Sequence, residues 1–267
     1  MNILYCGDSN ITKGVLLSAL SVCKHCDEKL DIYVLTATVG KHKAIESGFS
    51  QALEKAVRAK NKNSTVTLID LSDKFNSYLP VANMGTRFTP LCMLRLFADE
   101  VDELPNKLLY LDADVMCRKD ISTLYNTDIE DVEIMGVPDR YGKWFFGNIL
   151  KHDYLNSGVL LLNMKSIRKS GLFSKCRAMC HDKKMFMPDQ SALNKLAKKR
   201  KLPRIYNEQG KIKSDTVLKH FTTFFKFLPF FHAVTIKPWD EDRLHNELGV
   251  LEFDDILNKA KGVYENE

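Results

Sequence analysis

The chain lacks any long apolar run. Nowhere in its 267 residues does a stretch approach the roughly 18 consecutive apolar residues that a membrane-spanning helix needs. It begins on a strand-like segment, residues 2–6, with no charged leader, apolar signal region and cleavage site before it. These absences argue against a protein that crosses a membrane, and we expect a cytoplasmic location.

A disulfide framework is also missing. The seven cysteines are an odd number and are scattered from Cys6 to Cys180. Two local pairs, residues 23 and 26 and residues 176 and 180, could together supply four thiolate ligands for zinc. Each pair has helical spacing, however, and reduced, half-buried cysteines are common on helices. The pattern favours free thiols over a zinc site.

Charge of one sign is only weakly in excess. A net charge of +5 is too small to indicate a nucleic-acid partner, and we expect none. There is no internal repeat, low-complexity tract or Pro/Gly/Ser-rich linker. With 45% hydrophobic and 27% charged residues, the composition is that of an ordinary globular protein. We therefore predict one domain that spans residues 1–267.

Strand and helix signals alternate from the first residues. Apolar runs typical of strands lie at residues 3–6, 30–35, 65–69 and 108–111, and helical periodicity lies at residues 11–22, 41–59 and 91–97. This order predicts an α/β fold with a mostly parallel central sheet and helices on both faces. The second half is less regular, with strands expected at 133–137, 156–162 and 217–220 and helices at 166–182, 188–199 and 254–264.

The segment KLLYLDADVMCRKD, residues 107–120, is the most informative. A buried strand there ends in two carboxylates, Asp112 and Asp114, at the edge where open α/β sheets bind their ligands. Two carboxylates this close repel each other unless a cation lies between them, and hard divalent ions prefer such oxygen ligands. The segment therefore indicates a metal site for a phosphorylated substrate, with an acidic turn as the alternative.

Other polar residues follow predicted strands or begin predicted helices. Asp8 and Asn10 suit a turn or helix cap, or they could contact a nucleoside at the end of the first strand. Asn156, in Asn-Ser-Gly, fits a turn or a close backbone approach. Asp189 and Gln190 follow a proline at a helix start, where they could face a sugar.

Two residues near the C-terminus could complete the site. His220 ends a predicted strand, and its imidazole could join the two aspartates as a third ligand for manganese. The alternative is a histidine that is merely hydrogen-bonded. Lys237 lies in Lys-Pro-Trp, a rigid turn that suits phosphate but also occurs on ordinary surfaces.

Taken in order, four segments resemble the retaining glycosyltransferases of family 8, which include bacterial lipopolysaccharide galactosyl- and glucosyltransferases. The segments are LYLDADV at 109–115, NSGVLLLN at 156–163, DQ at 189–190 and KPW at 237–239. The resemblance runs from residue 8 to residue 239. It implies the GT-A fold, which is Rossmann-like, with a nucleotide-binding half in residues 1–120 and an elaborated donor-sugar and acceptor half in residues 121–267.

The resemblance also implies roles for the matching residues. The metal would be Mn²⁺, or Mg²⁺ in its place, and the donor would be UDP-galactose or UDP-glucose. The acceptor would be a saccharide or glycolipid in cell-surface polysaccharide or lipopolysaccharide synthesis. The metal ligands would be Asp112, Asp114 and a histidine; the donor residues would be Asp8, Asn10, Arg95, Ala113, Asn156 and Lys237, with Asp189 and Gln190 as catalytic candidates and Asp139 near the acceptor.

One segment departs from the family pattern. Members often have a compact HxxGxxKPW, but here residues 219–239 form a longer stretch without the glycine. His220 and His232 both remain candidates for the third metal ligand. We favour His220 because a strand end fixes ligand geometry better than a loop does.

Several functional alternatives stay open at this point. Retention of configuration at the anomeric carbon can arise in two ways. In one, a protein nucleophile attacks the sugar on the face opposite UDP; Asp189 is suited to this role and Gln190 poorly so. In the other, the acceptor attacks on the same face as UDP. The phenylalanines of residues 219–231 and the basic run at 195–201 fit a packed loop and a solvated helix end, or peripheral contact with an anionic membrane. An inactive nucleotide-sugar-binding paralogue and an aspartyl-nucleophile phosphatase are the rival functions.

Overall fold

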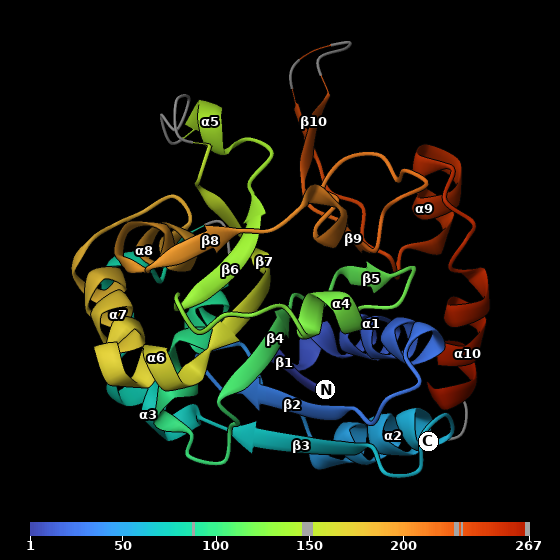
Figure 1. Cartoon of the computed structure of the whole chain (residues 1–267), viewed down its shortest axis with the longest axis horizontal. Helices are drawn as coiled ribbons and strands as arrows, with labels where there is room; N and C mark the ends of the chain where they lie inside the picture. Colours follow the sequence, from blue (N-terminus) through green and yellow to red (C-terminus); the bar gives the residue numbers. More distant parts are fainter. Residues whose placement is uncertain (87–88, 146–151, 227–229, 231, 265–267) are drawn as a thin grey trace.

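The computed structural model describes residues 1–86, 89–145, 152–226, 230 and 232–264. A seven-stranded sheet in the order β3-β2-β1-β4-β7-β6-β8 runs through its centre (Figure 1). Its strands are β1 Asn2–Gly7, β2 Asp31–Thr36, β3 Thr65–Asp70, β4 Lys107–Leu111, β6 Ile134–Pro138, β7 Leu155–Asn163 and β8 Lys199–Lys201. Only β7 is antiparallel to its neighbours, β4 and β6, among these strands. The predicted, mostly parallel sheet is confirmed.

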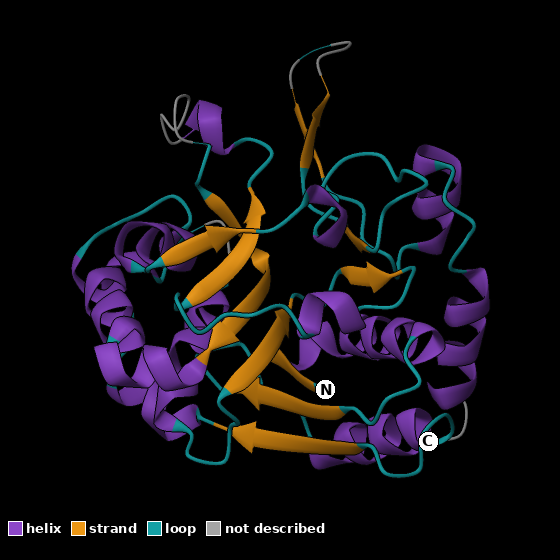
Figure 2. Cartoon of the chain, in the orientation of Figure 1, coloured by secondary structure: helices purple, strands orange, loops and turns teal. Residues whose placement is uncertain are grey.

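Helices cover both faces of this sheet (Figure 2). One layer contains α1 Thr12–His25, α2 Ser47–Arg58 and α10 Asp254–Tyr264; the other contains α3 Ser72–Ser77, the 3-10 helix η3 Pro90–Glu100, α6 Met164–Ser170, α7 Leu172–Asp182 and α8 Pro188–Leu196. Successive strand residues face opposite layers. In β1, Ile3 and Tyr5 pack with the first layer, whereas Leu4 packs with the second. The sheet thus separates two hydrophobic cores.

The direction of β7 determines which residues reach the site. Because β7 runs against the other strands, its first residues lie at the edge where those strands end. The backbone N–H of Asp112, which follows β4, donates a hydrogen bond of 2.8 Å to the carbonyl of Gly158 in β7. The residues after β4 and those that open β7 therefore meet at one edge of the sheet.

Smaller elements build the wall above this edge. Strand β5, Val115–Cys117, pairs antiparallel with β9, Leu218–His220, and Val115 lies opposite His220. A second pair, β10 Phe224–Lys226 and β11 His232–Val234, forms a ribbon that projects from the body (Figure 1). Short helices α4 Ser122–Tyr125, α5 Gly142–Phe145, η1 Ser9–Ile11, η2 Val81–Asn83 and η4 Arg204–Tyr206, and the longer α9 Glu241–Leu248, complete the described elements.

Three predicted helices need correction. The one expected at 166–182 is two helices, α6 and α7, because Gly171 adopts a left-handed φ of 67° between them. The one expected at 188–199 ends at Leu196, and Lys199–Lys201 form β8 at the sheet edge. The one expected at 41–59 begins only at Ser47, because the preceding residues form a turn in which the Ile45 N–H bonds to Thr36 Oγ1 at 2.8 Å.

The cysteine pairs lie in different cores. Cys23 and Cys26 pack in the core beside α1, whereas Cys176 and Cys180 pack in the core on the other face of the sheet. The four thiols therefore do not share a site. In the part of the chain that the structure describes, no helix combines the length and the apolar character that crossing a bilayer requires.

Candidate active site

Asp112, Asp114 and His220 come together at the carboxyl edge of the sheet. The β5–β9 pairing brings the imidazole over the turn that follows β4, so that His220 Nε2 lies 3.2 Å from Asp114 Oδ1 and 3.6 Å from Asp112 Oδ2. Gly158 makes this approach possible, since a Cβ there would lie 2.0 Å from His220 Cε1. Among the described residues, these form the one group of three or more His, Cys, Asp or Glu side chains whose ligand atoms all lie within 4.8 Å of one another.

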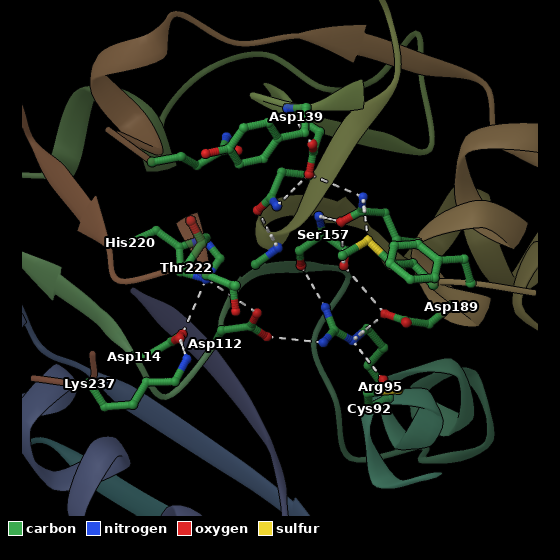
Figure 3. A pocket seen from close by; sticks show the side chains of 18 of the residues that line it. Cys92, Arg95, Asp112, Asp114, Asp139, Ser157, Asp189, His220, Thr222 and Lys237 are labelled. Atoms are coloured by element: carbon green, nitrogen blue, oxygen red, sulfur yellow. Dashed lines mark hydrogen bonds and ion pairs between the residues drawn. The ribbon is translucent and has the colours of Figure 1, made fainter. Parts of the chain in front are cut away.

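Asp114 is buried but stays charged. Burial alone would raise the pKa of its carboxyl group, but the nearby Lys237 ammonium and His220 outweigh that cost and hold the pKa well below its ordinary value. Lys237 Nζ donates a hydrogen bond to Asp114 Oδ2 and another, of 3.3 Å, to the Phe221 carbonyl. Figure 3 shows this lysine beside the two aspartates. A cation therefore already faces the carboxylate pair.

Two hydrogen-bond donors orient the Asp112 carboxylate. Its Oδ1 accepts hydrogen bonds from Arg95 Nη2 at 3.0 Å and from the Tyr110 hydroxyl at 2.6 Å. The guanidinium carbon of Arg95 lies 4.0 Å from the centre of the Tyr110 ring, which adds a cation–π contact. With Oδ1 held in this way, Oδ2 faces His220.

Arg95 also reaches the predicted catalytic pair. Its Nε lies 3.4 Å from Asp189 Oδ2, and burial raises the pKa of Asp189 while the charge of Arg95 opposes that rise. Ser157 Oγ lies 3.3 Å from the same Asp189 oxygen, and the Ser157 N–H donates to Gln190 Oε1 at 3.0 Å. Both candidate side chains are thus already hydrogen-bonded within the protein.

Asp139 and Asn156 belong to the same network. Asp139 Oδ2 accepts from Asn156 Nδ2 at 3.0 Å and from Gln190 Nε2 at 3.2 Å. The predicted acceptor residue therefore contacts the predicted donor residue Asn156 and the catalytic candidate Gln190. Asn207, which the sequence reasoning missed, bonds to Asn156 at 2.9 Å and to His220 at 3.1 Å. No local pattern marks Asn207, because both of its partners are distant in sequence.

A pocket of about 240 Å³ opens over this network (Figure 3). Nine predicted residues line it: Arg95, Asp112, Asp114, Asp139, Asn156, Asp189, Gln190, His220 and Lys237. Several other residues line the pocket without having been predicted from the sequence, among them Cys92, Tyr141, Ser157, Thr222 and Phe225. Ser157 and Gly158 were within reach, because they adjoin Asn156 in the Asn-Ser-Gly segment.

Three predicted residues do not line the pocket. Asp8, at the end of β1, is 2% exposed and caps η1, where its carboxylate accepts from the backbone N–H and side chain of Asn10, both at 3.1 Å. It also contacts His42 Nδ1 at 2.6 Å. Ala113 packs toward α1, where a Cβ on Gly14 would lie 2.6 Å from the Ala113 carbonyl. The Asp8 and Asn10 side chains thus hold the turn that follows β1.

His232 lies apart from the aspartates. It is on β11, and its Nδ1 bonds to the Phe230 carbonyl at 2.8 Å. Its ring also contacts the ring of Phe230, with 5.3 Å between the centroids. The two histidines that the sequence left open therefore occupy different places, and His220 is the one beside Asp112 and Asp114.

The potential metal-ligand atoms at this edge of the sheet fit a divalent cation. Two carboxylate oxygens and one imidazole nitrogen are ligands that manganese accepts, and carboxylates also suit magnesium. Lys237 and Arg95 place further positive charge around the same point. A site with this charge pattern can bind a diphosphate and stabilise negative charge that develops on it.

Comparisons of the sequence with known proteins place it among glycosyltransferases. Residues 2–243 match the profile of Glycosyl transferase family 8. Lipopolysaccharide 1,2-glucosyltransferase of Escherichia coli (strain K12) is 29% identical over 260 residues, which cover 90% of this chain and 72% of that protein. Probable glycosyl transferase Gly of Streptococcus gordonii is 34% identical over 133 residues, which cover 48% of this chain and only 18% of that protein.

Solved structures share the fold. The galactosyltransferase LgtC, solved in complex with donor and acceptor sugar analogues, superposes with a TM-score of 0.71 at 20% identity, covering 98% of this chain and 96% of that chain. GlyE of Streptococcus pneumoniae TIGR4 gives 0.62 at 19% identity, covering 98% of this chain and 64% of that one. The predicted GT-A fold is confirmed by these likenesses. Since the family profile extends over nearly the whole sequence, the chain belongs to glycosyl transferase family 8 and is a glycosyltransferase.

Proposed function

We propose that this glycosyltransferase moves a hexose from UDP-galactose or UDP-glucose to a saccharide or glycolipid acceptor. The observation that carries the proposal is the convergence of Asp112, Asp114 and His220 beside Lys237 in one pocket. A relative named as a lipopolysaccharide glucosyltransferase and a structural neighbour bound to donor and acceptor sugar analogues support the substrate class. The intact charge cluster favours an active enzyme over an inactive paralogue.

The same three residues would hold the metal, with Mn²⁺ first and Mg²⁺ second. A bound divalent ion supplies Lewis-acid stabilisation of the departing diphosphate. Lys237 adds a fixed positive charge beside Asp114, and Arg95 holds the Asp112 carboxylate in place by its hydrogen bond to Oδ1. Both cations belong to the chain and need no reorganisation when the bond breaks.

We assign the nucleotide to residues 1–120 and the sugar and acceptor to residues 121–267, within one domain. Asp8 and Asn10, at the end of β1, would present the turn around η1 to the uridine. The strands of the two halves join directly, because β4 is hydrogen-bonded to β7. The donor would therefore lie across the junction, with its diphosphate at Asp112 and its sugar near Asn156 and Gln190.

For the chemical step we propose attack on the same face as UDP. The bond between the anomeric carbon and the phosphate oxygen breaks, and its electron pair stays on UDP. The acceptor hydroxyl oxygen forms the new bond and gives its proton to a phosphate oxygen. This route is supported because both alternative nucleophiles already have partners in the protein. Asp189 is paired with Arg95, and the amide oxygen of Gln190 accepts a hydrogen bond from the Ser157 N–H.

The acceptor would enter between α5 and the β10–β11 ribbon. Tyr141, which precedes α5, packs edge-on against Phe225 of β10 with 5.0 Å between the ring centroids, and both line the pocket. Trp144 and Phe230 expose 72% and 69% of their surfaces. Such aromatic groups suit peripheral contact with a cytoplasmic membrane surface that carries a glycolipid. Residues 227–229 and 231 of the predicted phenylalanine-rich loop lie outside the described residues.

A donor panel tests the proposal. UDP- and GDP-sugars are incubated with the protein and a saccharide acceptor, with Mn²⁺ or with chelator, and nucleotide release is followed by mass spectrometry. We expect UDP release from a UDP-hexose that requires the metal. Release of inorganic phosphate from simple monoesters would support the rival phosphatase, and binding of donor without turnover would support an inactive paralogue.

A further inference from the structure

We propose that Asn207 is a positioning residue that fixes the proton of the His220 ring on Nδ1, so that Nε2 is the nitrogen offered to the metal. This inference rests on the proposed function, because it takes His220 as a metal ligand. Asn207 follows η4 and is 1% exposed. Its Oδ1 lies 3.1 Å from His220 Nδ1, and its Nδ2 donates to Asn156 Oδ1 at 2.9 Å.

The contacts of Asn156 determine which atoms donate and which accept in this chain of hydrogen bonds. An ionised carboxylate only accepts hydrogen bonds and a backbone N–H only donates them. Asn156 places its side chain between one group of each kind. Its Nδ2 faces Asp139 Oδ2 at 3.0 Å, and its Oδ1 faces the Gly158 N–H at 3.1 Å. Turning the Asn156 amide over would break both contacts, so only one orientation satisfies it.

The orientation of Asn207 follows from that of Asn156. Because Asn156 Oδ1 can only accept, Asn207 must present its NH₂ group there, and its own oxygen then faces His220. That oxygen also only accepts, so the proton between the two side chains belongs to His220 Nδ1. Metal ligation needs the lone pair of the other nitrogen. Nε2 is the nitrogen that lies 3.2 Å from Asp114 Oδ1.

The backbone around Asn207 is held against the same strand. The Glu208 N–H donates to the Leu218 carbonyl at 2.9 Å, and the His220 N–H donates to the Glu208 carbonyl at 3.1 Å. Lys219 is buried and donates from Nζ to the carbonyls of Glu208 at 3.2 Å and His220 at 3.0 Å. These bonds fix Asn207 beside His220 before any ligand arrives, as positioning requires.

Metal affinity measured without substrate tests the inference. Mn²⁺ binding to the full chain is titrated by electron paramagnetic resonance. We expect Asn207→Ala to weaken Mn²⁺ binding by about 10- to 100-fold, the usual effect of removing a partner of a metal ligand. Asn163→Ala is the matched control, because the Asn163 side chain makes three hydrogen bonds, one more than that of Asn207, but lies at the opposite end of β7 from Asn156. It should leave Mn²⁺ affinity unchanged.

The ring proton gives a second, independent measurement. In ¹⁵N-labelled protein with Mg²⁺, a protected Nδ1–H signal that is lost in His220→Gln identifies the ring of His220. We expect Asn207→Ala to lose or shift this signal. Asn207→Ser, whose side chain is too short to reach Nδ1, should act in the same way if the alanine variant folds poorly.

The two measurements separate the possible failures. An Asn207→Ala protein with the wild-type ring signal and wild-type Mn²⁺ affinity would overturn the inference. If the wild-type protein binds no Mn²⁺, the proposed metal role of His220 fails. The Nδ1–H signal of His220 in metal-free protein then tests the role of Asn207 separately. Survival of that signal in Asn207→Ala would overturn the positioning role, and loss of the signal would support it.

Discussion

Arg95 donates a hydrogen bond of 3.0 Å from Nη2 to Oδ1 of Asp112. The same guanidinium lies 3.4 Å from Asp189 Oδ2 through its Nε, so one buried cation joins the predicted metal ligand to the predicted catalytic pair. The charge balance of the pocket and the orientation of its carboxylates therefore depend on a residue that the family resemblance assigned only to donor contact.

Replacing Arg95 should damage both stability and activity. Arg95→Met leaves two carboxylates without their cation, and we expect the free energy of unfolding to fall by about 3–5 kcal/mol. Misplacement of Asp112 should lower kcat by about 100-fold. Arg177→Met is the matched control, since buried Arg177 pairs with Asp99 and Glu100 away from the pocket. It should lose comparable stability while the folded fraction keeps wild-type kcat. Equal kcat losses in the two variants would contradict this.

Gly158 should not tolerate a methyl group. In Gly158→Ala the new Cβ would overlap His220 and lie 2.8 Å from Asp112 Oδ2, so we expect a stability loss of about 1–3 kcal/mol together with weaker Mn²⁺ binding. Gly48→Ala is the control, because nothing lies within 4 Å of its Cβ position in α2. That helix change should stabilise the protein by about 0.5–1 kcal/mol. Thermal unfolding and a Mn²⁺ titration measure both effects.

The two candidate histidines should behave differently. His220→Gln removes the imidazole from the aspartate pair, and we expect Mn²⁺ affinity to fall by at least about 10-fold. His232→Gln alters only the ribbon beyond β10 and should bind Mn²⁺ as the wild type does. Calorimetric titration of both variants decides the point. The opposite ranking would assign the third ligand to His232.

The same-face route predicts that no sugar becomes attached to the protein. Incubated with UDP-hexose and metal but without acceptor, the wild-type chain should keep its unmodified mass, because Asp189 and Gln190 are engaged by Arg95 and Ser157. Intact-protein and peptide mass spectrometry provide the measurement. A hexosyl adduct on the peptide containing Asp189 or Gln190 would establish a double displacement instead.

The strands were predictable because their signal is local. Residues 3–6, 30–35 and 65–69 are mostly apolar runs, and each matches a strand of the parallel half to within one residue at its start. The break between α6 and α7 could not be predicted from the sequence, because a glycine inside a helical pattern is often tolerated. Nothing in the local sequence indicates that Gly171 turns left-handed.

The site was predictable where side chains follow strand ends, and less so where distant segments meet. Asp112 follows its strand visibly in the sequence, and its place at the sheet edge follows from topology. Asn207 contacts His220 and Asn156, which lie 13 and 51 residues away along the chain. Its role arises only from the pairing of the segment after η4 with β9, and no motif records that contact.

Metal-dependent hexose transfer by Asp112→Asn tests the central claim most directly. Transfer from the UDP-hexose is measured with Mn²⁺ and in metal-depleted buffer, beside wild type and the exposed control Asp102→Asn. We expect wild type and Asp102→Asn to be active only with Mn²⁺, and Asp112→Asn to be inactive in both buffers. Near-normal transfer by Asp112→Asn in metal-depleted buffer would contradict a metal site at Asp112, Asp114 and His220.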